Sequence, residues 1–309
     1  MTRAGSELDV RWDAGAFNNG LFFGAMSRLV SSLPRRCSYA LAHPGAWVAY
    51  RLTRDGARAV IENLRVVRPD ASERELRRLA VLTFRSYARD FVDFIRGVSM
   101  TRAELEPLIA AFDGHRFDEL LAGGRGVILV SGHFGNWELG GIVIRLLLGC
   151  PLTVVGKPEP SPMVSALRRR LRESFDIETI EIGRVLETAL QIRRALAANT
   201  VVAMLLDRHL GRDQVEVTFF GRPTQFAKSP AMIAYLSNAP LLPSFMIRQA
   251  DGRFAAVCST PIKPDTTMPP EEAIREMTQA FASELEARIR AHPHLWYQFY
   301  PYWRAEQPA

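Results

Sequence analysis

Residues 127–141 read Val127-Ile128-Leu129-Val130-Ser131-Gly132-His133-Phe134-Gly135-Asn136-Trp137-Glu138-Leu139-Gly140-Gly141. The run 127–130 is apolar throughout, follows a glycine-rich turn and predicts a short strand that is buried on both faces. Residues 139–148 predict a helix, so the glycine-containing segment between them is a strand-to-helix loop. In open α/β sheets ligands bind at the carboxyl ends of the strands. This loop is therefore the expected place for a functional site.

The rest of the chain extends the same alternation of strand and helix. Short apolar runs predict further strands, and stretches of helical period lie between several of them. Because parallel strands need crossover connections and helices supply them, we expect an α/β fold with a mainly parallel central sheet flanked by helices. The expected strands are 152–155, 177–182, 201–206, 215–220, 241–247 and 254–258, and the expected helices are 139–148, 163–174, 185–197, 230–237 and 271–291.

The first hundred residues have a different pattern. From residue 51 to residue 96 apolar side chains recur at helical spacing, and Ser72 followed by Glu75 predicts a capping box that opens a helix. We therefore expect a helical N-terminal region at residues 1–112 and an α/β core at residues 113–309. The two parts are not expected to fold independently.

The N-terminal region also contains a candidate membrane segment. Residues 14–50 are apolar and aromatic, but arginines interrupt them before about 18 uncharged residues accumulate, so a transmembrane helix is not expected. Apolar residues between Leu21 and Tyr50 gather on one side at helical spacing, with arginines beside them, which is typical of a helix lying in a membrane interface. The alternative is that this face packs on the protein's own core.

The charge and the cysteine content indicate which partners and which cellular compartment to expect. The 309 residues carry a formal net charge of +6, which suits an anionic membrane surface or an acidic carrier protein. The sequence contains no nucleic-acid recognition signature, so we expect no nucleic-acid partner. Its three cysteines lack the spacing of a disulfide framework or a zinc site, which predicts no metal and a reducing compartment. Because the start has no signal-peptide pattern, secretion is not expected.

His133 and Glu138 are the candidate catalytic pair. Within one continuous helix five residues would put them on different faces, but a loop at 132–136 lets the two side chains converge. Asn136 is placed to cap the helix, which leaves Glu138 in the first turn, where the helix dipole favours its ionised form. An ionised Glu138 would orient the imidazole and stabilise the imidazolium that forms after proton abstraction. Since histidines at strand ends are often structural, the spacing alone does not establish catalysis.

The motif and its surroundings resemble a known superfamily. His133, Asn136, Trp137 and Glu138 match the His-x-x-Asn-Trp-Glu/Asp motif of bacterial lysophospholipid-type acyltransferases. The similarity is greatest to the branch with the lauroyl and myristoyl acyltransferases of lipid A biosynthesis and the acyltransferase of phosphatidylinositol mannosides. The sequence departs from this family in a shorter, less hydrophobic N-terminal anchor and at 228–229. Further matching segments are 205–210, 215–221, 227–230, 239–243, 296–297 and 303–304.

The resemblance implies an O-acyltransferase. Such an enzyme moves a fatty acyl chain from a thioester of acyl carrier protein or coenzyme A to a hydroxyl of a membrane glycolipid, a lipid A precursor or similar. It implies a peripheral or monotopic protein at the cytoplasmic face of the bacterial inner membrane, with no cofactor. His133 would take the proton of the acceptor hydroxyl, and Asp207 would be the second acidic residue beside it. A salt bridge to Arg208 or a helix cap is the alternative role for Asp207.

Substrate binding is expected from the loop and from a basic surface. Backbone amides of residues 134–136 are candidate donors to the tetrahedral oxyanion. The resemblance places a functional arginine near residues 168–170, because phosphate groups need guanidinium donors, although such a cluster is more often a solvated helix face. The expected substrate-binding residues are Phe134, Asn136, Lys157, Arg170 and Arg208.

Other function classes remain open from the residues alone. A serine hydrolase is disfavoured because the sequence has no Gly-x-Ser-x-Gly turn. A metal-dependent hydrolase would gather His133, Glu138, Asp207 and His209 around one cation, although their spacing matches no familiar metal signature. A non-catalytic lipid-binding membrane protein would explain the apolar N-terminal helices but not the turn from His133 to Glu138.

Overall fold

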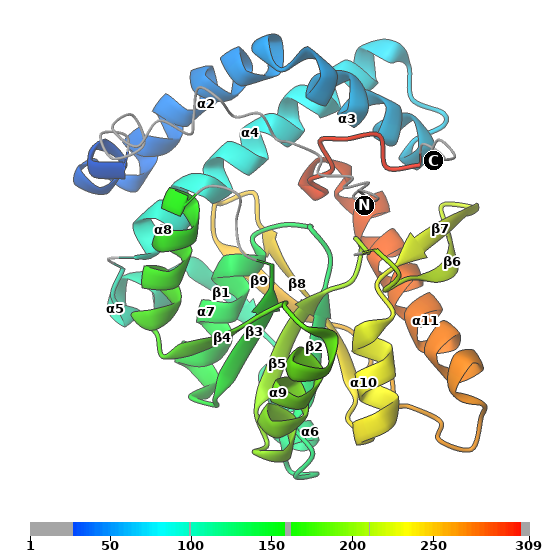
Figure 1. The fold of residues 1–309 in the computed structure, drawn as a ribbon. Helices are drawn as coiled ribbons and strands as arrows, with labels where there is room; N and C mark the ends of the chain where they lie inside the picture. Colours follow the sequence, from blue (N-terminus) through cyan, green and yellow to red (C-terminus); the bar gives the residue numbers. More distant parts are fainter. Residues whose placement is uncertain (1–26, 99, 158–161, 210, 304–309) are drawn as a thin grey trace, which may run out of the picture.

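The structure, a computed structural model, describes residues 27–98, 100–157, 162–209 and 211–303. Within these residues a seven-stranded sheet has the order β1-β9-β8-β2-β5-β3-β4 (Figure 1). The five strands from β8 to β4 run parallel, while β9 and β1 run in the opposite direction. The strands are β1 (Ile109–Phe112), β2 (Val127–Ser131), β3 (Leu152–Gly156), β4 (Ile177–Glu181), β5 (Val201–Leu205), β8 (Leu241–Arg248) and β9 (Phe254–Cys258), with β6 (Val215–Phe219) and β7 (Arg222–Phe226) forming a separate antiparallel pair.

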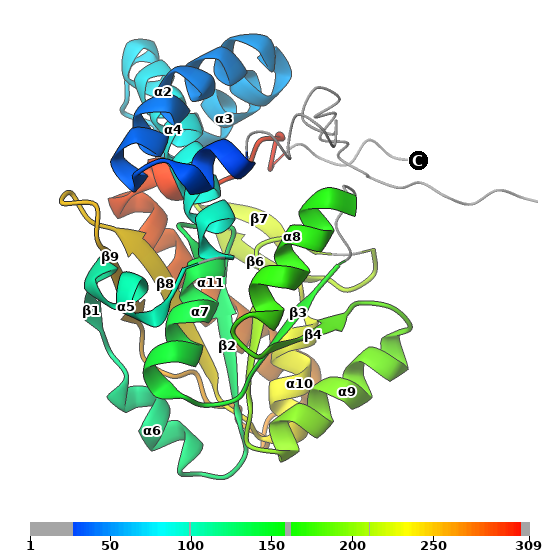
Figure 2. The same ribbon diagram turned by 90° about the vertical axis from the view of Figure 1, so that its left-hand side faces the viewer.

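Helices cover both faces of the sheet (Figures 1 and 2). Their bounds are α2 (Arg35–Leu52), α3 (Arg54–Val67), α4 (Glu73–Gly97), α5 (Arg102–Leu105), α6 (His115–Leu121), α7 (Trp137–Leu148), α8 (Pro162–Glu173), α9 (Val185–Ala197), α10 (Ser229–Ser237) and α11 (Pro270–Ala291), with 3-10 turns η1 (Glu106–Leu108) and η2 (Pro293–Leu295). The predicted class, α/β with a mainly parallel central sheet flanked by helices and a helical N-terminal region, is confirmed.

Strand β2 shows why an apolar run was needed at the centre of the sheet. All five of its residues are buried. Because side chains alternate across a strand, Val127 and Leu129 join the apolar cluster formed with α7 and α8, whereas Ile128 and Val130 join the cluster formed with α9, α10 and α11. A polar residue at any of these positions would lie in one of the two cores.

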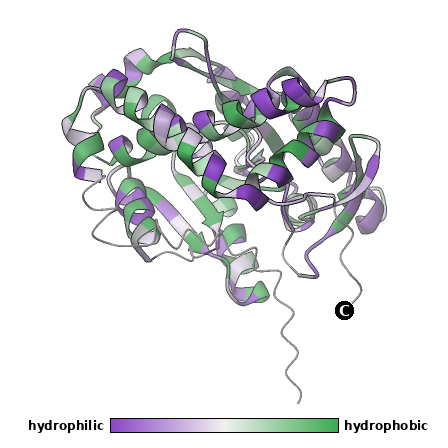
Figure 3. Ribbon diagram, turned by 90° about the horizontal axis from the view of Figure 1, so that it is seen from above, coloured by the Kyte–Doolittle hydropathy of each residue, from purple (hydrophilic) through white to green (hydrophobic). Residues whose placement is uncertain are grey.

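Helices α2, α3 and α4 form a layer over one end of the sheet (Figure 1). Hydrophobic and hydrophilic residues are interspersed along the helices seen from above (Figure 3). The predicted capping box is present at the start of α4, where Ser72 and Glu75 bond to each other's backbone N–H. The C-terminal segment after η2 packs beneath this layer, since Tyr297 and Phe299 share an apolar cluster with residues of α3 and α4.

The predicted elements of the α/β core are all present, with ends that differ by at most two residues. Strands β1 and β7 were not predicted from the sequence. Strand β1 has only four residues and pairs with β9 at the sheet edge, so it joins the sheet from the N-terminal side of the expected boundary at residue 112. Strand β7 reads Arg-Pro-Thr-Gln-Phe, and its proline and polar residues obscure a strand pattern.

The expected membrane segment is only partly covered, since Leu21 to Met26 lie outside the described residues. Val30 is buried against α4, so part of the predicted apolar face packs on the protein itself. Other large apolar side chains of this region are exposed. They are Leu29, Leu41, Trp47, Val48 and Leu52. In the part of the chain that the structure describes, no helix is both long and apolar enough to cross a membrane.

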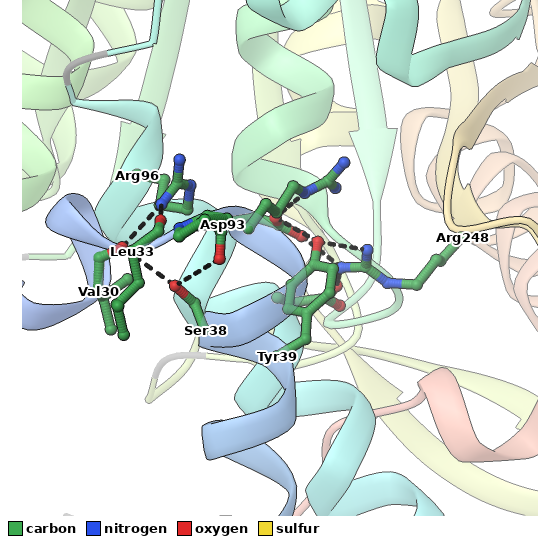
Figure 4. A network of polar contacts seen from close by, with 10 residues as sticks. Val30, Leu33, Ser38, Tyr39, Asp93, Arg96 and Arg248 are labelled. Atoms are coloured by element: carbon green, nitrogen blue, oxygen red, sulfur yellow. Dashed lines mark hydrogen bonds and ion pairs between the residues drawn. The ribbon is translucent and has the colours of Figure 1, made fainter.

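A buried ionic network fastens the helical layer to the sheet (Figure 4). Arg248, at the end of β8, pairs with Asp90 and Asp93 of α4. Tyr39 of α2 donates its hydroxyl to Asp93 Oδ1 at 2.5 Å and accepts from Arg248 Nη1 at 2.9 Å. Arg35 Nε lies 3.0 Å from the same carboxylate oxygen of Asp93. Three elements that are distant in sequence are thus joined by one guanidinium.

Replacing Arg248 with Met should destabilise the protein strongly, because Asp90 and Asp93 would stay buried without their cation. Breaking a buried pair from one side costs about 3–5 kcal/mol, measured as the loss of unfolding free energy in urea denaturation. The matched control is Arg65→Met, which removes an ion pair of 2.5 Å to Glu73 between two exposed side chains and should cost at most about 1 kcal/mol. Equal losses in the two variants would contradict the importance of burial here.

Candidate functional site

Parallel pairing of β2 and β5 brings His133 and Asp207 together across 74 residues of sequence. Ser131 and Leu205, the last residues of these strands, are in register, and the Leu206 N–H donates to the Ser131 carbonyl at 3.0 Å. His133 and Asp207 each follow that pair by two positions. Both side chains therefore emerge at the carboxyl edge of the sheet, where the sequence predicted a site.

His133 and Asp207 form a buried hydrogen-bonded pair. His133 Nδ1 lies 2.7 Å from Asp207 Oδ1, and the His133 N–H donates to Asp207 Oδ2 at 2.9 Å. The same Oδ2 accepts from Trp296 Nε1 at 3.2 Å and from Gln298 Nε2 at 2.7 Å. Asp207 is 0 % exposed, so these donors replace water. Because a carboxylate only accepts, Nδ1 carries the ring proton and Nε2 is the basic nitrogen.

The surrounding charges hold this pair in the form that a general base needs. Burial and the Arg208 guanidinium lower the pKa of His133 below its ordinary value, although Asp207 opposes them. Burial raises the pKa of Asp207, but the charge of His133, its hydrogen bonds and Arg208 together outweigh burial, and the pKa lies below its usual range. At neutral pH the imidazole is therefore neutral and the carboxylate ionised.

Glu138 lies in the first turn of α7, as predicted, but it faces two arginines. Its Oε1 lies 2.7 Å from Arg168 Nε and 3.3 Å from Arg172 Nη2, and all three side chains are largely buried. Among the contacts of the described residues, no hydrogen bond or ion pair joins Glu138 to His133. This differs from the expectation that Glu138 would orient the imidazole, because Asp207 occupies Nδ1.

The path of the loop from β2 to α7 depends on Gly135. Its φ is +62°, and a Cβ there would lie 2.1 Å from the Met246 carbonyl oxygen, so no other residue fits. The chain then reaches Asn136, whose Oδ1 accepts from the Leu139 N–H at 3.2 Å. Asn136 is thus the N-cap of α7, as the sequence predicted, and it fixes where the helix and Glu138 begin.

The backbone amides of this loop are used inside the protein. The N–H groups of residues 134–136 donate in turn to the carbonyls of Gly132, Leu295 and Met246, at 2.7, 2.8 and 3.1 Å. They are therefore not the free oxyanion donors that the sequence suggested. The Phe134 ring is fully buried and packs edge-on against Phe245, so it has no surface to offer a substrate, in contrast to the expected binding role.

Comparison with known proteins identifies the family. The sequence profile of the bacterial lipid A biosynthesis acyltransferase family matches residues 19–305. The chain belongs to this family. A phosphatidylinositol mannoside acyltransferase of Mycobacterium tuberculosis is 30% identical over 233 residues, 74% of this chain and 71% of the relative. The same enzyme of Mycolicibacterium smegmatis is 28% identical over 305 residues, 97% of this chain and 96% of the relative. The protein is thus an acyltransferase of the lipid A or phosphatidylinositol mannoside type.

In this acyltransferase the predicted cationic residues have different surroundings. Lys157 is exposed directly after β3, at the same sheet edge as His133. Arg208 is engaged with the C-terminal segment, where it donates to Gln298 Oε1 at 2.9 Å and to the Tyr297 carbonyl at 2.8 Å. A free anion would therefore find Lys157 more accessible than Arg208.

Some arginine side chains of α8 contact Glu138, and others are exposed to solvent. Arg168 and Arg172, four residues apart and so on one helix face, both reach Glu138. Arg170, which the sequence analysis chose, is exposed on another face of the same helix. Arg172 was not among the predicted site residues, although it lies four residues after Arg168 in the predicted helix.

The C-terminal segment supplies further contacts that sequence reasoning missed. Trp296 and Gln298 donate to Asp207, and the Tyr297 N–H donates to the His133 carbonyl at 2.8 Å. The resemblance included residues 296–297 without a role for them. Nothing in local sequence places a segment 89 residues beyond Asp207 against it, so only the tertiary structure reveals these partners.

The metal-dependent alternative finds no support in the geometry. Across the ranges that the structure describes, no three His, Cys, Asp or Glu side chains gather where one ion could be held. Of the four residues considered, His133 and Asp207 bond to each other, while Glu138 pairs with Arg168 and Arg172. These described residues therefore do not converge on one cation site.

Replacing Gly135 with Ala should displace the loop and His133 with it. The strain of a left-handed Ala and the overlap with the Met246 carbonyl together cost roughly 2–4 kcal/mol, measured by urea denaturation, and acyl transfer should fall with them. Gly149→Ala is the matched control, since Gly149 has φ of +67° but open space around its Cβ position, and it should cost about 1 kcal/mol. Similar losses in both variants would mean that the close approach to Met246 is unimportant.

Proposed function

We infer that the protein is an O-acyltransferase that moves a fatty acyl chain from a thioester of acyl carrier protein or coenzyme A to a hydroxyl of a membrane glycolipid. The observation that carries this proposal is the buried His133–Asp207 pair, in which Nδ1 is held by a carboxylate and Nε2 is left as the base. The names of the relatives support a glycolipid acceptor such as a phosphatidylinositol mannoside or a lipid A precursor.

The proposed reaction uses His133 as base and then as acid. The acceptor hydroxyl gives its proton to His133 Nε2 while its oxygen attacks the thioester carbonyl carbon. The π electrons of the carbonyl bond move onto the carbonyl oxygen, which becomes the oxyanion of a tetrahedral intermediate. The tetrahedral intermediate then collapses, the C–S bond breaks, and the leaving thiolate takes the proton from Nε2. Asp207 keeps the imidazole in the required tautomer and stabilises the imidazolium between the two steps. No covalent acyl-enzyme is formed.

Glu138 has a different part in the proposed site. As a carboxylate between Arg168 and Arg172 it fixes both guanidiniums at the start of α7. Arginines held in this way bind phosphate with geometric specificity, and both a carrier thioester and a phospholipid headgroup contain phosphate. Lys157, Arg170 and Arg208 are proposed as the outer part of this anion-binding surface.

The proposed location is the cytoplasmic face of the bacterial inner membrane, with peripheral or monotopic attachment. The support lies in α2, where Leu41, Val48 and Leu52 are exposed and recur at a spacing that puts them on one helix face. Arg51 stacks on the exposed Trp47 ring at 5.2 Å, an arrangement suited to the headgroup region, where aromatic and basic side chains are favoured. Anionic lipid would add electrostatic attraction.

His133→Ala should lower transfer from palmitoyl-coenzyme A to a phosphatidylinositol mannoside by roughly 10² to 10⁴-fold, which is the contribution of general base catalysis. Asp207→Asn should cause a comparable loss, because an amide cannot hold Nδ1–H in the same way. The double variant should be scarcely worse than His133→Ala, since Asp207 acts through the base. Labelled acyl product, counted in all three folded variants, is the measurement.

Glu138→Gln provides the comparison within the same assay. If Glu138 acts by holding Arg168 and Arg172, its loss should raise KM for the thioester and resemble Arg168→Ala. Near-wild-type transfer by folded His133→Ala would end the proposed mechanism. If the double variant lost activity by the product of the two single fold-losses, Asp207 would instead act independently of the base.

Replacing Leu41 and Leu52 together with Glu should reduce binding to anionic liposomes. Each leucine removed from a lipid contact forfeits on the order of 1.5–3 kcal/mol at full burial, so the floated fraction should drop by at least about tenfold. The matched control changes Val185 and Leu186 of α9, which are also exposed, to Glu. A double α2 variant that floats as well as wild type, or a control that loses as much, would refute α2 as the membrane contact.

A further inference from the structure

A buried amide links Arg208 to the His133–Asp207 pair. Gln298 is 1 % exposed. Its Nε2 donates to Asp207 Oδ2 at 2.7 Å, and its Oε1 accepts from Arg208 Nε at 2.9 Å. With the 2.7 Å contact from Asp207 Oδ1 to His133 Nδ1, these four side chains form one continuous chain of hydrogen bonds that ends at the proposed base.

The chemistry of the two neighbours leaves one orientation for the amide. A guanidinium only donates and an ionised carboxylate only accepts, so a residue between them must accept on one side and donate on the other. Gln298 does both with a single rigid, neutral group. A carboxylate or an ammonium at this position would bond to one neighbour and lose the hydrogen bond to the other.

The backbone holds Gln298 in this place. The Gln298 carbonyl accepts from Asn63 Nδ2 of α3 at 3.0 Å. The preceding residue, Tyr297, donates its N–H to the His133 carbonyl at 2.8 Å and its hydroxyl to Asp90 Oδ2 of α4 at 2.6 Å. The amide is thus fixed by the helical layer before any substrate binds.

We propose that Gln298 is a positioning residue for acyl transfer, through which Arg208 acts on Asp207 and so sets the basicity of His133. The proposal rests on the function proposed above. The positive guanidinium polarises the amide, which strengthens the N–H donated to Asp207. Part of the carboxylate charge is thereby compensated, Asp207 attracts an imidazolium less strongly, and His133 stays neutral to lower pH.

Besides burial and Arg208, Arg168 also lowers the pKa of His133, but its ion pair is with Glu138, and the phenols nearby do not titrate in the range of the test. The charged and titratable side chains around His133 and Asp207 are Arg168 of α8, Arg208 after β5, Asp90 of α4, and Tyr297, Tyr300 and Tyr302 of the C-terminal segment. Burial raises the pKa of Tyr300 to about 12 and that of Tyr297 and Tyr302 well above the ordinary value. These phenols therefore do not titrate between pH 5 and 9.

The test measures the His133 titration directly in the full chain, by NMR of its ring Cε1 proton between pH 4 and 9. Gln298→Met keeps the side-chain length and removes both hydrogen bonds, so Asp207 holds the imidazolium more strongly. The midpoint of the titration should move upward by roughly half a pH unit or more. Arg208→Met should move it in the same direction, because it removes the charge at the start of the chain, but the direct field of the guanidinium on His133 contributes to that shift. If Gln298→Met does not fold, Gln298→Asn tests the relay, since its shorter amide cannot reach both neighbours and the midpoint should again move upward.

Two controls separate a relay from general damage. Gln191→Met, on the exposed face of α9, should leave the midpoint unchanged. The double variant Gln298→Met with Arg208→Met should shift less than the sum of the single variants, since both interrupt the same path. An unchanged or lowered midpoint in folded Gln298→Met, or shifts that add fully, would overturn the proposal.

Kinetic measurements distinguish the role proposed for Gln298 from the proposed acyl transfer with His133 as the base. Since only neutral His133 accepts a proton, an upward midpoint in the free protein means that the acid limb of the kcat/KM profile for transfer from palmitoyl-coenzyme A moves upward too. Activity of Gln298→Met at pH 6 should then fall several-fold more than at pH 8. An NMR shift without a matching shift of the acid limb would keep the relay but refute His133 as the base.

Discussion

A fully buried carboxylate has to be compensated inside the protein, and Asp207 imposes this constraint on much of the fold. Its donors come from two distant parts of the chain, the loop after β2 and the segment after η2. Without one of these donors, part of the desolvation penalty of the Asp207 carboxylate would be uncompensated, and the fold would be less stable. The C-terminal segment must therefore cross the carboxyl edge of the sheet beside His133, and the helices that cover this segment become part of the site.

The N-terminal helices accordingly contribute to the site as well as to the proposed membrane contact. Asn63 of α3 and Asp90 of α4 hold the backbone and the phenol of the segment that touches His133 and Asp207. Asp90 is itself paired with Arg248, whose network reaches Tyr39 of α2. A continuous path of buried polar contacts thus joins the helix with the exposed apolar face to the proposed catalytic pair. A shift of that layer would therefore be transmitted to His133, because packed interiors do not deform freely.

The two acidic residues near the start of α7, Asp207 and Glu138, have different neighbours and therefore suit different roles. Asp207 faces an imidazole and the indole and amide donors of the C-terminal segment, which suits the proposed proton transfer. Glu138 faces Arg168 and Arg172, and the three charges together leave a net positive environment at a helix N-terminus, which favours anions. The proposed base and the proposed anion site are therefore adjacent but electrostatically distinct.

Local patterns in the sequence were enough to predict the layered core and the sheet edge at which His133 lies. The apolar run at 127–130 had to be a buried strand, and Gly135 and Asn136 fixed the turn that presents His133, because local sterics and capping act within a few residues. Which carboxylate meets the imidazole was decided only by the tertiary structure, since the register of β2 with β5 places Asp207 there across 74 residues. The same holds for Arg172, whose contact with Glu138 depends on how α8 packs on α7. It also holds for Gln298, which reaches Asp207 only because the C-terminal segment returns to the sheet. Non-local packing of this kind cannot be recognised from the local spacing of residues.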